Sequence, residues 1–140
     1  MAGHDLVREV GVRAGIVPIY ATTNHATTAS EVNATGYSRA MWIIQTGAMD
    51  ATAVLTMKVQ NSTASGGTFS DVTSAALVNA TNASASKVFL IDHAINASYP
   101  YLKLNGTSGT ARAYVAATVV LYGKNGLVRD TVTAAQVIDL

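Results

Sequence analysis

The stretch Gly109-Thr-Ala-Arg-Ala-Tyr-Val-Ala-Ala-Thr-Val-Val-Leu-Tyr-Gly123 decides the fold of this chain. Successive side chains of a β-strand point to opposite faces, so its residues divide into two rows. One row is wholly apolar and consists of Ala111, Ala113, Val115, Ala117, Val119 and Leu121. The other row is mixed and consists of Arg112, Tyr114, Ala116, Thr118, Val120 and Tyr122. We predict a long central strand, with Val115, Val119 and Leu121 as core anchors and the mixed face half in water or against another chain.

Similar patterns predict further strands upstream. These are expected at residues 16–22, 37–45, 51–60, 68–72, 87–95 and 99–104. Trp42, the only tryptophan, lies in a run that is apolar on both faces and is a predicted core anchor. This number of strands at such spacing indicates a sandwich or a small barrel. We predict an all-β chain that forms an antiparallel β-sandwich, of which a jelly roll is one form.

The connections between these strands carry turn residues and little periodicity. Residues 23–36 are expected to form a long loop, and residues 73–86 either a weak strand or a loop. A turn at 46–50 is expected to pair the two strands that flank it, and a hairpin turn at 105–109 to lead into the long strand.

The ends of the chain differ from its body. We expect residues 1–15 to form an N-terminal arm, residues 16–123 the sandwich, and residues 124–140 a tail or an extra strand. The apolar side chains of the two terminal segments need a partner surface. Two tyrosines within the predicted 99–104 strand are further candidates for an interface. The predicted interface residues are therefore Leu6, Val7, Val10, Tyr99, Tyr101, Leu127, Val128, Val137 and Ile138.

The composition favours permanent contacts between subunits. Charged residues make up 12% of the 140 residues, against roughly 25% in a typical soluble domain. A neutral surface rich in Ala, Thr, Ser and Asn loses its water easily. The net charge is +1 and the basic residues are scattered, so we expect no nucleic-acid and no membrane partner. No apolar run approaches the ~18 residues of a membrane span, and we expect synthesis in the cytoplasm.

Candidate chemistry is sparse. The chain has no cysteine, and its histidines are His4, His25 and His93. Asp92 and His93 are neighbours in a predicted strand, so they point to opposite faces and cannot share a metal. No serine lies in a Gly-x-Ser-x-Gly elbow, and the carboxylates lack calcium-loop spacing. We expect no catalytic, cofactor or metal site, and hence no enzyme.

Tyr99 and Tyr101 support a different kind of function. On one strand face they would offer two rings on which a sugar could stack. A role in the core or in an interface is the alternative that we favour.

A family resemblance rests on the order of several segments. These are Trp42-Ile-Ile-Gln-Thr-Gly47, Leu55-Thr-Met-Lys-Val-Gln-Asn-Ser62, Gly66-Gly-Thr-Phe-Ser-Asp-Val72 and the strand that ends in Val119-Val-Leu-Tyr-Gly123. In this order, over residues 37–123, the chain resembles small virion proteins of tailed bacteriophages that are similar to capsid decoration, or cement, proteins.

The resemblance implies a β-sandwich that assembles as homotrimers on the outside of a capsid and reinforces it. The implied partners are other copies of the chain and the major capsid protein, and the implied location is the capsid surface of the virion. A tail or head-tail subunit fits the same residues. A carbohydrate-binding sandwich is the alternative from another class.

Overall fold

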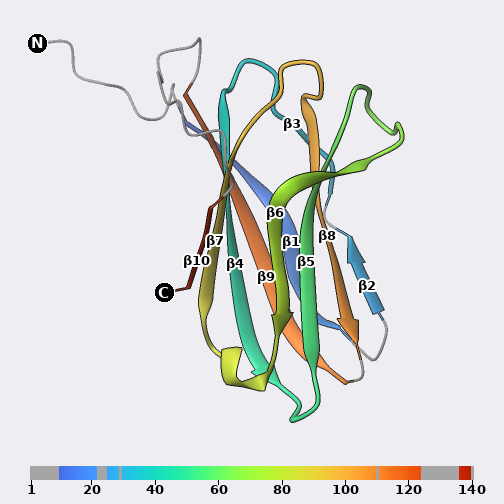
Figure 1. The fold of residues 1–140 in the computed structure, drawn as a ribbon, viewed down its shortest axis with the longest axis vertical. Helices are drawn as coiled ribbons and strands as arrows, with labels where there is room; N and C mark the ends of the chain where they lie inside the picture. Colours follow the sequence, from blue (N-terminus) through green and yellow to red (C-terminus); the bar gives the residue numbers. More distant parts are fainter. Residues whose placement is uncertain (1–9, 22–24, 29, 110, 124–135, 140) are drawn as a thin grey trace, which may run out of the picture.

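The structure is a computed structural model that describes residues 10–21, 25–28, 30–109, 111–123 and 136–139. Two antiparallel sheets pack against each other (Figure 1). Sheet A contains, in spatial order, β1 (Gly11–Ala21), β9 (Ala113–Tyr122), β4 (Arg39–Met49), β7 (Val88–Ala94) and β10 (Gln136–Asp139). Sheet B contains β2 (His25–Thr28), β8 (Tyr101–Gly109), β5 (Val54–Ser62) and β6 (Ser70–Ala80), and β3 (Val32–Asn33) also pairs with β8.

The order of the strands is that of a jelly roll. Along the chain, β1, β4, β7 and β9 lie in sheet A, whereas β2, β5, β6 and β8 lie in sheet B. The facing orders β1-β9-β4-β7 and β2-β8-β5-β6 describe an eight-stranded sandwich built from two Greek keys. The predicted antiparallel β-sandwich is confirmed, in its jelly-roll form, and β10 extends sheet A beyond β7.

The core consists of the inner rows of both sheets. Trp42 is fully buried, and Val115, Val119 and Leu121 are at most 2% exposed. Sheet B contributes Leu55, Met57, Val59, Leu102 and Leu104 to the same cluster. The structure thus places all four expected anchors between the sheets.

Two predicted pairings are wrong. Residues 46–49 continue β4 instead of turning, and the chain then crosses to sheet B through a turn in which the Ala53 N–H donates to the Asp50 carbonyl. β4 therefore pairs with β7 and β9, not with β5. Residues 105–109, where a hairpin turn was expected, likewise belong to β8 in sheet B. The chain then crosses to sheet A, where β9 begins. Apolar alternation fixes the inward face of a strand but does not identify its neighbour.

Several predicted boundaries also move. β1 begins at Gly11, so residues 11–15 belong to sheet A and not to an arm. The expected loop at 23–36 contains β2 and β3, which are short and both pair with β8. The uncertain stretch at 73–86 contains most of β6 and a 3-10 turn, η1 (Asn82–Ser84). No helix among the described residues is long and apolar enough to cross a membrane.

Candidate interaction surface

The outer face of sheet B is polar. β5 and β8 direct a row of hydrogen-bonding and charged side chains outward, namely Thr56, Lys58, Gln60, Lys103, Asn105 and Thr107. Asp71 accepts hydrogen bonds from Lys58 Nζ and Gln60 Nε2, each at 2.8 Å. Lys103 Nζ lies 4.2 Å from the centroid of the Phe69 ring. This face has the composition of a surface that remains in water.

The outer face of sheet A has the opposite character. Between its ends, β4, β7 and β9 direct outward the largely apolar set Met41, Ile43, Val88, Leu90, Ala116, Thr118 and Val120. β1 adds Val12, which pairs with Val120 and is 57% exposed. The seven residues of β4, β7 and β9 are partly buried in the single chain, and apolar surface left accessible on a sheet is a candidate contact site. We call it the sheet A outer face.

A tyrosine pair stands at one end of this face. Tyr20 of β1 lies opposite Tyr114 of β9, and their rings stack with centroids 4.3 Å apart and an interplanar angle of 25°. They remain 37% and 48% exposed, respectively. The Arg112 guanidinium carbon lies 5.6 Å from the Tyr20 ring centroid, within cation-π range. Arg112 also pairs with Asp50 at 3.4 Å.

A trough of about 450 Å³ adjoins the tyrosine pair. Its lining includes Pro18 of β1, Tyr114 and Ala116 of β9, Gln45 and Gly47 of β4, and Lys87 and Val88 where β7 begins. Gly47 allows β4 to lie close to Tyr114 in the wall of the trough, because a Cβ at this position would lie 2.9 Å from the Tyr114 Cβ. The small residues Gly47 and Ala116 therefore create a hollow beside a projecting aromatic pair.

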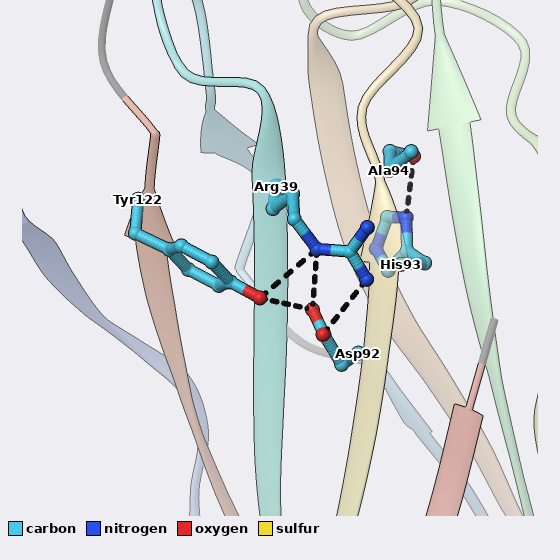
Figure 2. Close-up of polar contacts among 5 residues, drawn as sticks. All are labelled: Arg39, Asp92, His93, Ala94 and Tyr122. Carbon is cyan, nitrogen blue, oxygen red and sulfur yellow. Dashed lines mark hydrogen bonds and ion pairs between the residues drawn. The ribbon is translucent and has the colours of Figure 1, made fainter. Parts of the chain in front are cut away.

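A polar cluster closes the other end of the sheet A outer face (Figure 2). Arg39 Nη2 donates to Asp92 Oδ2 at 2.8 Å, and Arg39 Nε donates to the Tyr122 hydroxyl at 3.0 Å. The Tyr122 hydroxyl in turn donates to Asp92 Oδ1 at 2.7 Å. These residues come from β4, β7 and β9, so the cluster ties three adjacent strands together.

Electrostatics agree with a structural role for this cluster. The hydrogen bond to Asp92 raises the pKa of Arg39, which is only 4% exposed, so its guanidinium stays charged. Burial, reinforced by the Asp92 hydrogen bond, raises the pKa of Tyr122. The phenol therefore remains protonated near neutral pH and donates to the carboxylate. Each polar group already has a partner within the cluster.

His93 points inward, on the face opposite Asp92, as the strand pattern predicts. Trp42 Nε1 donates to its Nε2 at 3.3 Å, and its Nδ1 lies 3.0 Å from the Ala94 carbonyl oxygen. Both contacts are satisfied by the neutral tautomer that carries its proton on Nδ1. Burial lowers the pKa of His93 and keeps the ring neutral. The imidazole thus accepts the hydrogen bond of the buried Trp42 indole.

The predicted interface residues lie in several places. Val10, partly exposed, precedes β1, and Tyr101 is partly buried at the start of β8. Val137 and Ile138 belong to β10, opposite Ile91 and Leu90. Leu6, Val7, Leu127 and Val128 lie outside the described residues, as does His4, while His25 is in β2.

Tyr99 and Tyr101 do not share a strand face. Tyr99 lies in the turn before β8, where its N–H donates to the Asn96 carbonyl, and it is 39% exposed. Pro100 has no N–H with which to extend the ladder. Among the described residues, the stacked aromatic pair is Tyr20 with Tyr114. Sequence reasoning identified the mixed face of Tyr114 but missed Tyr20, because their pairing depends on long-range register.

Chemical groups for metal binding do not gather in the described part of the chain. No three His, Cys, Asp or Glu side chains there are close enough together to hold an ion. The candidate site of the described residues is the sheet A outer face, with an apolar middle, an aromatic end and a polar end whose groups bond to one another.

Comparisons with known proteins agree with the fold. No family model matches the chain, and a search of curated proteins found no match. Among solved structures, the chain is similar to one in the structure of infectious bursal disease virus, Gx strain, with a TM-score of 0.55 and 12% sequence identity. The similarity covers 83% of this chain and 32% of the viral one, so this chain spans about a third of the length of that neighbour. At this identity the likeness concerns the fold alone.

Proposed function

We propose that this chain is a structural protein of a virus particle, and specifically that it binds the outside of a tailed-phage capsid as a homotrimer and stabilises it. The observation that carries the proposal is the contrast between the polar outer face of sheet B and the apolar sheet A outer face. A folded sandwich that leaves one sheet face apolar gains free energy when another protein covers that face. Such a protein works through binding.

The polar groups of the described residues favour the same conclusion. Arg39, Asp92 and Tyr122 bond to one another, and His93 is neutral and packed against Trp42. An activated nucleophile or a general base needs a group that is open to a substrate. The strongest titratable cluster of the described chain is instead engaged in holding strands together, which supports a structural role.

Two likenesses support a virion as the place of assembly. The sequence resembles small phage virion proteins over residues 37–123, and the fold is similar to a chain from the structure of a virus. Binding to the folded, assembled capsid stabilises it by linkage, because a ligand that prefers the assembled state shifts the equilibrium toward it. The major capsid protein is the proposed partner.

A carbohydrate-binding sandwich is the second candidate, and one observation favours it. The exposed Tyr114 ring lines a trough together with the polar side chain of Gln45, which is a combination that suits a sugar ring. The site would then lie at Tyr20 and Tyr114, not at Tyr99 and Tyr101.

The decisive experiment mixes the purified chain with capsids assembled from the major capsid protein of the same virus. After sedimentation, we expect the chain to pellet with the capsids at a fixed ratio and to raise the temperature at which they disrupt. A glycan-binding assay serves as the comparison. A chain that stays in the supernatant and leaves capsid disruption unchanged contradicts the proposal, and saturable glycan binding in its place would support the second candidate.

A further inference from the structure

We propose that copies of this chain bind one another through the sheet A outer face, with the tyrosine pair of one copy seated in the trough of the next. The inference deepens the proposed function and rests on it only for the expectation of a homo-oligomer. It names the surface, the residues and the kind of contact that join the subunits.

The tyrosine pair has the properties of a binding hot spot. Tyrosine and arginine are enriched among the residues that dominate protein interfaces. Tyr20 and Tyr114 already stack, and Arg112 lies over the Tyr20 ring, so little side-chain freedom is lost when a partner covers them. Both rings nevertheless remain more than a third exposed in the single chain.

The trough offers a complementary surface on the same sheet. Its far side is formed by Gln45 of β4 and Val88 of β7, whereas the tyrosine pair stands on β1 and β9. Because the order is β1-β9-β4-β7, the strands that carry the tyrosine pair lie beside β4 and β7, which contribute Gln45 and Val88 to the trough (Figure 1). A contact between two different patches is heterologous, and it ends in a ring when the rotation between copies closes. Three sheet A outer faces turned toward a common axis form such a ring.

Charge favours a second copy as the occupant. At the aromatic end Arg112 pairs with Asp50, and at the far end Arg39 pairs with Asp92. Two copies of this face therefore meet without bringing these charges together unpaired, which would weaken association across an interface.

The edge of the sheet disfavours the other route to self-association. β1 is one of the two edge strands of sheet A, the other being β10, and it contains Pro18, which cannot donate to another strand. Register shifts between Ala14 and Ile16 and between Ile16 and Ile19 further break its regularity. Such features protect edge strands from pairing with other chains. At the β1 edge, beside the tyrosine pair, these features favour association through the face over strand pairing.

Sedimentation of the full-length chain, without capsids, tests the inference. We expect the unmodified chain to form a closed oligomer at micromolar concentration. Tyr20→Ser on the projection, and separately Val88→Arg in the trough, should each weaken association roughly tenfold or more. Thr107→Asp, on the exposed outer face of sheet B, is the matched control and should associate normally. Circular dichroism and melting curves verify that each variant is folded. If Tyr20→Ser melts early, Tyr20→Leu replaces it, and if Val88→Arg melts early, Gln45→Trp replaces it.

A mixing experiment tests whether the tyrosine pair of one copy meets the trough of another. The Val88→Arg chain keeps its tyrosine pair, and the Tyr20→Ser chain keeps its trough, because Tyr20 does not line it. Mixed together, the two variants should therefore form one-to-one pairs that neither forms alone. Oligomers that persist in both variants, or an unmodified chain that is monomeric, overturn the inference. A monomer that still binds capsids would overturn the inference and the proposed homotrimer, but would leave the proposed capsid binding standing. An oligomer that does not bind capsids would support the inference and contradict the proposed function.

Discussion

Arg39 and Asp92 form an ion pair across β4 and β7, with Nη2 and Oδ2 2.8 Å apart, at the end of a largely apolar sheet face. The Arg39 side chain is only 5% exposed, whereas that of Asp92 is 22% exposed. Tyr122 of β9 completes the arrangement by bonding to both. The pair thus fixes the position of three strands whose outer surface we propose to be the subunit contact.

Asp92→Asn should destabilise the fold, because the buried Arg39 guanidinium loses its counter-charge. Breaking a buried pair costs about 3–5 kcal/mol, and the partial exposure of Asp92 reduces our expectation to about 2–3 kcal/mol. Urea unfolding followed by tryptophan fluorescence measures the change. Asp71→Asn, which breaks the exposed pair with Lys58, is the control and should have little effect. Equal decreases in the free energy of unfolding of the two variants would show that the Arg39–Asp92 pair stabilises the fold no more than the exposed Lys58–Asp71 pair.

Trp42→Ala should lower the free energy of unfolding by roughly 3–5 kcal/mol, as other large aromatic truncations in cores do. Trp42 is fully buried, and its removal also leaves His93 Nε2 without its donor. Trp42→Phe keeps much of the volume and should cost less. Denaturant melts followed by circular dichroism give both values, and a loss near zero for Trp42→Ala would contradict its role as an anchor.

His93 should make stability depend on pH. Burial lowers its pKa in the folded chain, so below the ordinary histidine value of about 6.5 the unfolded chain binds a proton that the folded chain does not. The contribution is fully present above that value and is lost as the pH falls toward the folded pKa. Unfolding free energies measured from pH 7.5 to pH 5 should decrease in the native chain and flatten in His93→Gln. Parallel curves would exclude His93 as the source.

The terminal segments provide a further test. Removal of residues 1–9 leaves β1 whole, so the melting temperature should change little while capsid attachment weakens. Removal of residues 126–140 also takes away β10, which pairs with β7, and should additionally lower the melting temperature. Calorimetry and capsid sedimentation on both truncated chains measure the two effects. Unchanged attachment in both would show that neither end of the chain contributes to it.

The sequence predicts the strands better than their partners. Alternation from Ala113 to Leu121 identifies the buried row of β9, and the same signal locates β4, β5 and β7. It cannot show that β4 lies between β7 and β9, because pairing in a jelly roll joins segments that are far apart in the chain. β2 and β3 escaped prediction because they are short and lie among Thr, Asn and Ala residues that also suit loops.

Part of the candidate surface could be predicted from the sequence. The mixed row that contains Tyr114 predicts a face in contact with water or another chain, and the low charge predicts assembly. The stack of Tyr20 on Tyr114 depends on the register between β1 and β9, which bulges in β1 displace. The hollow at Gly47 exists because β4 continues where a turn was expected. These features follow from tertiary structure alone.

Electron cryo-microscopy of capsids incubated with the full-length chain tests the central claim most directly. The account predicts jelly-roll density on the outside of the capsid, in groups of three, with the sheet A outer faces turned toward one another and the outer face of sheet B toward water. Capsids without added density, or bound copies whose sheet A outer faces lie open to water, would contradict it.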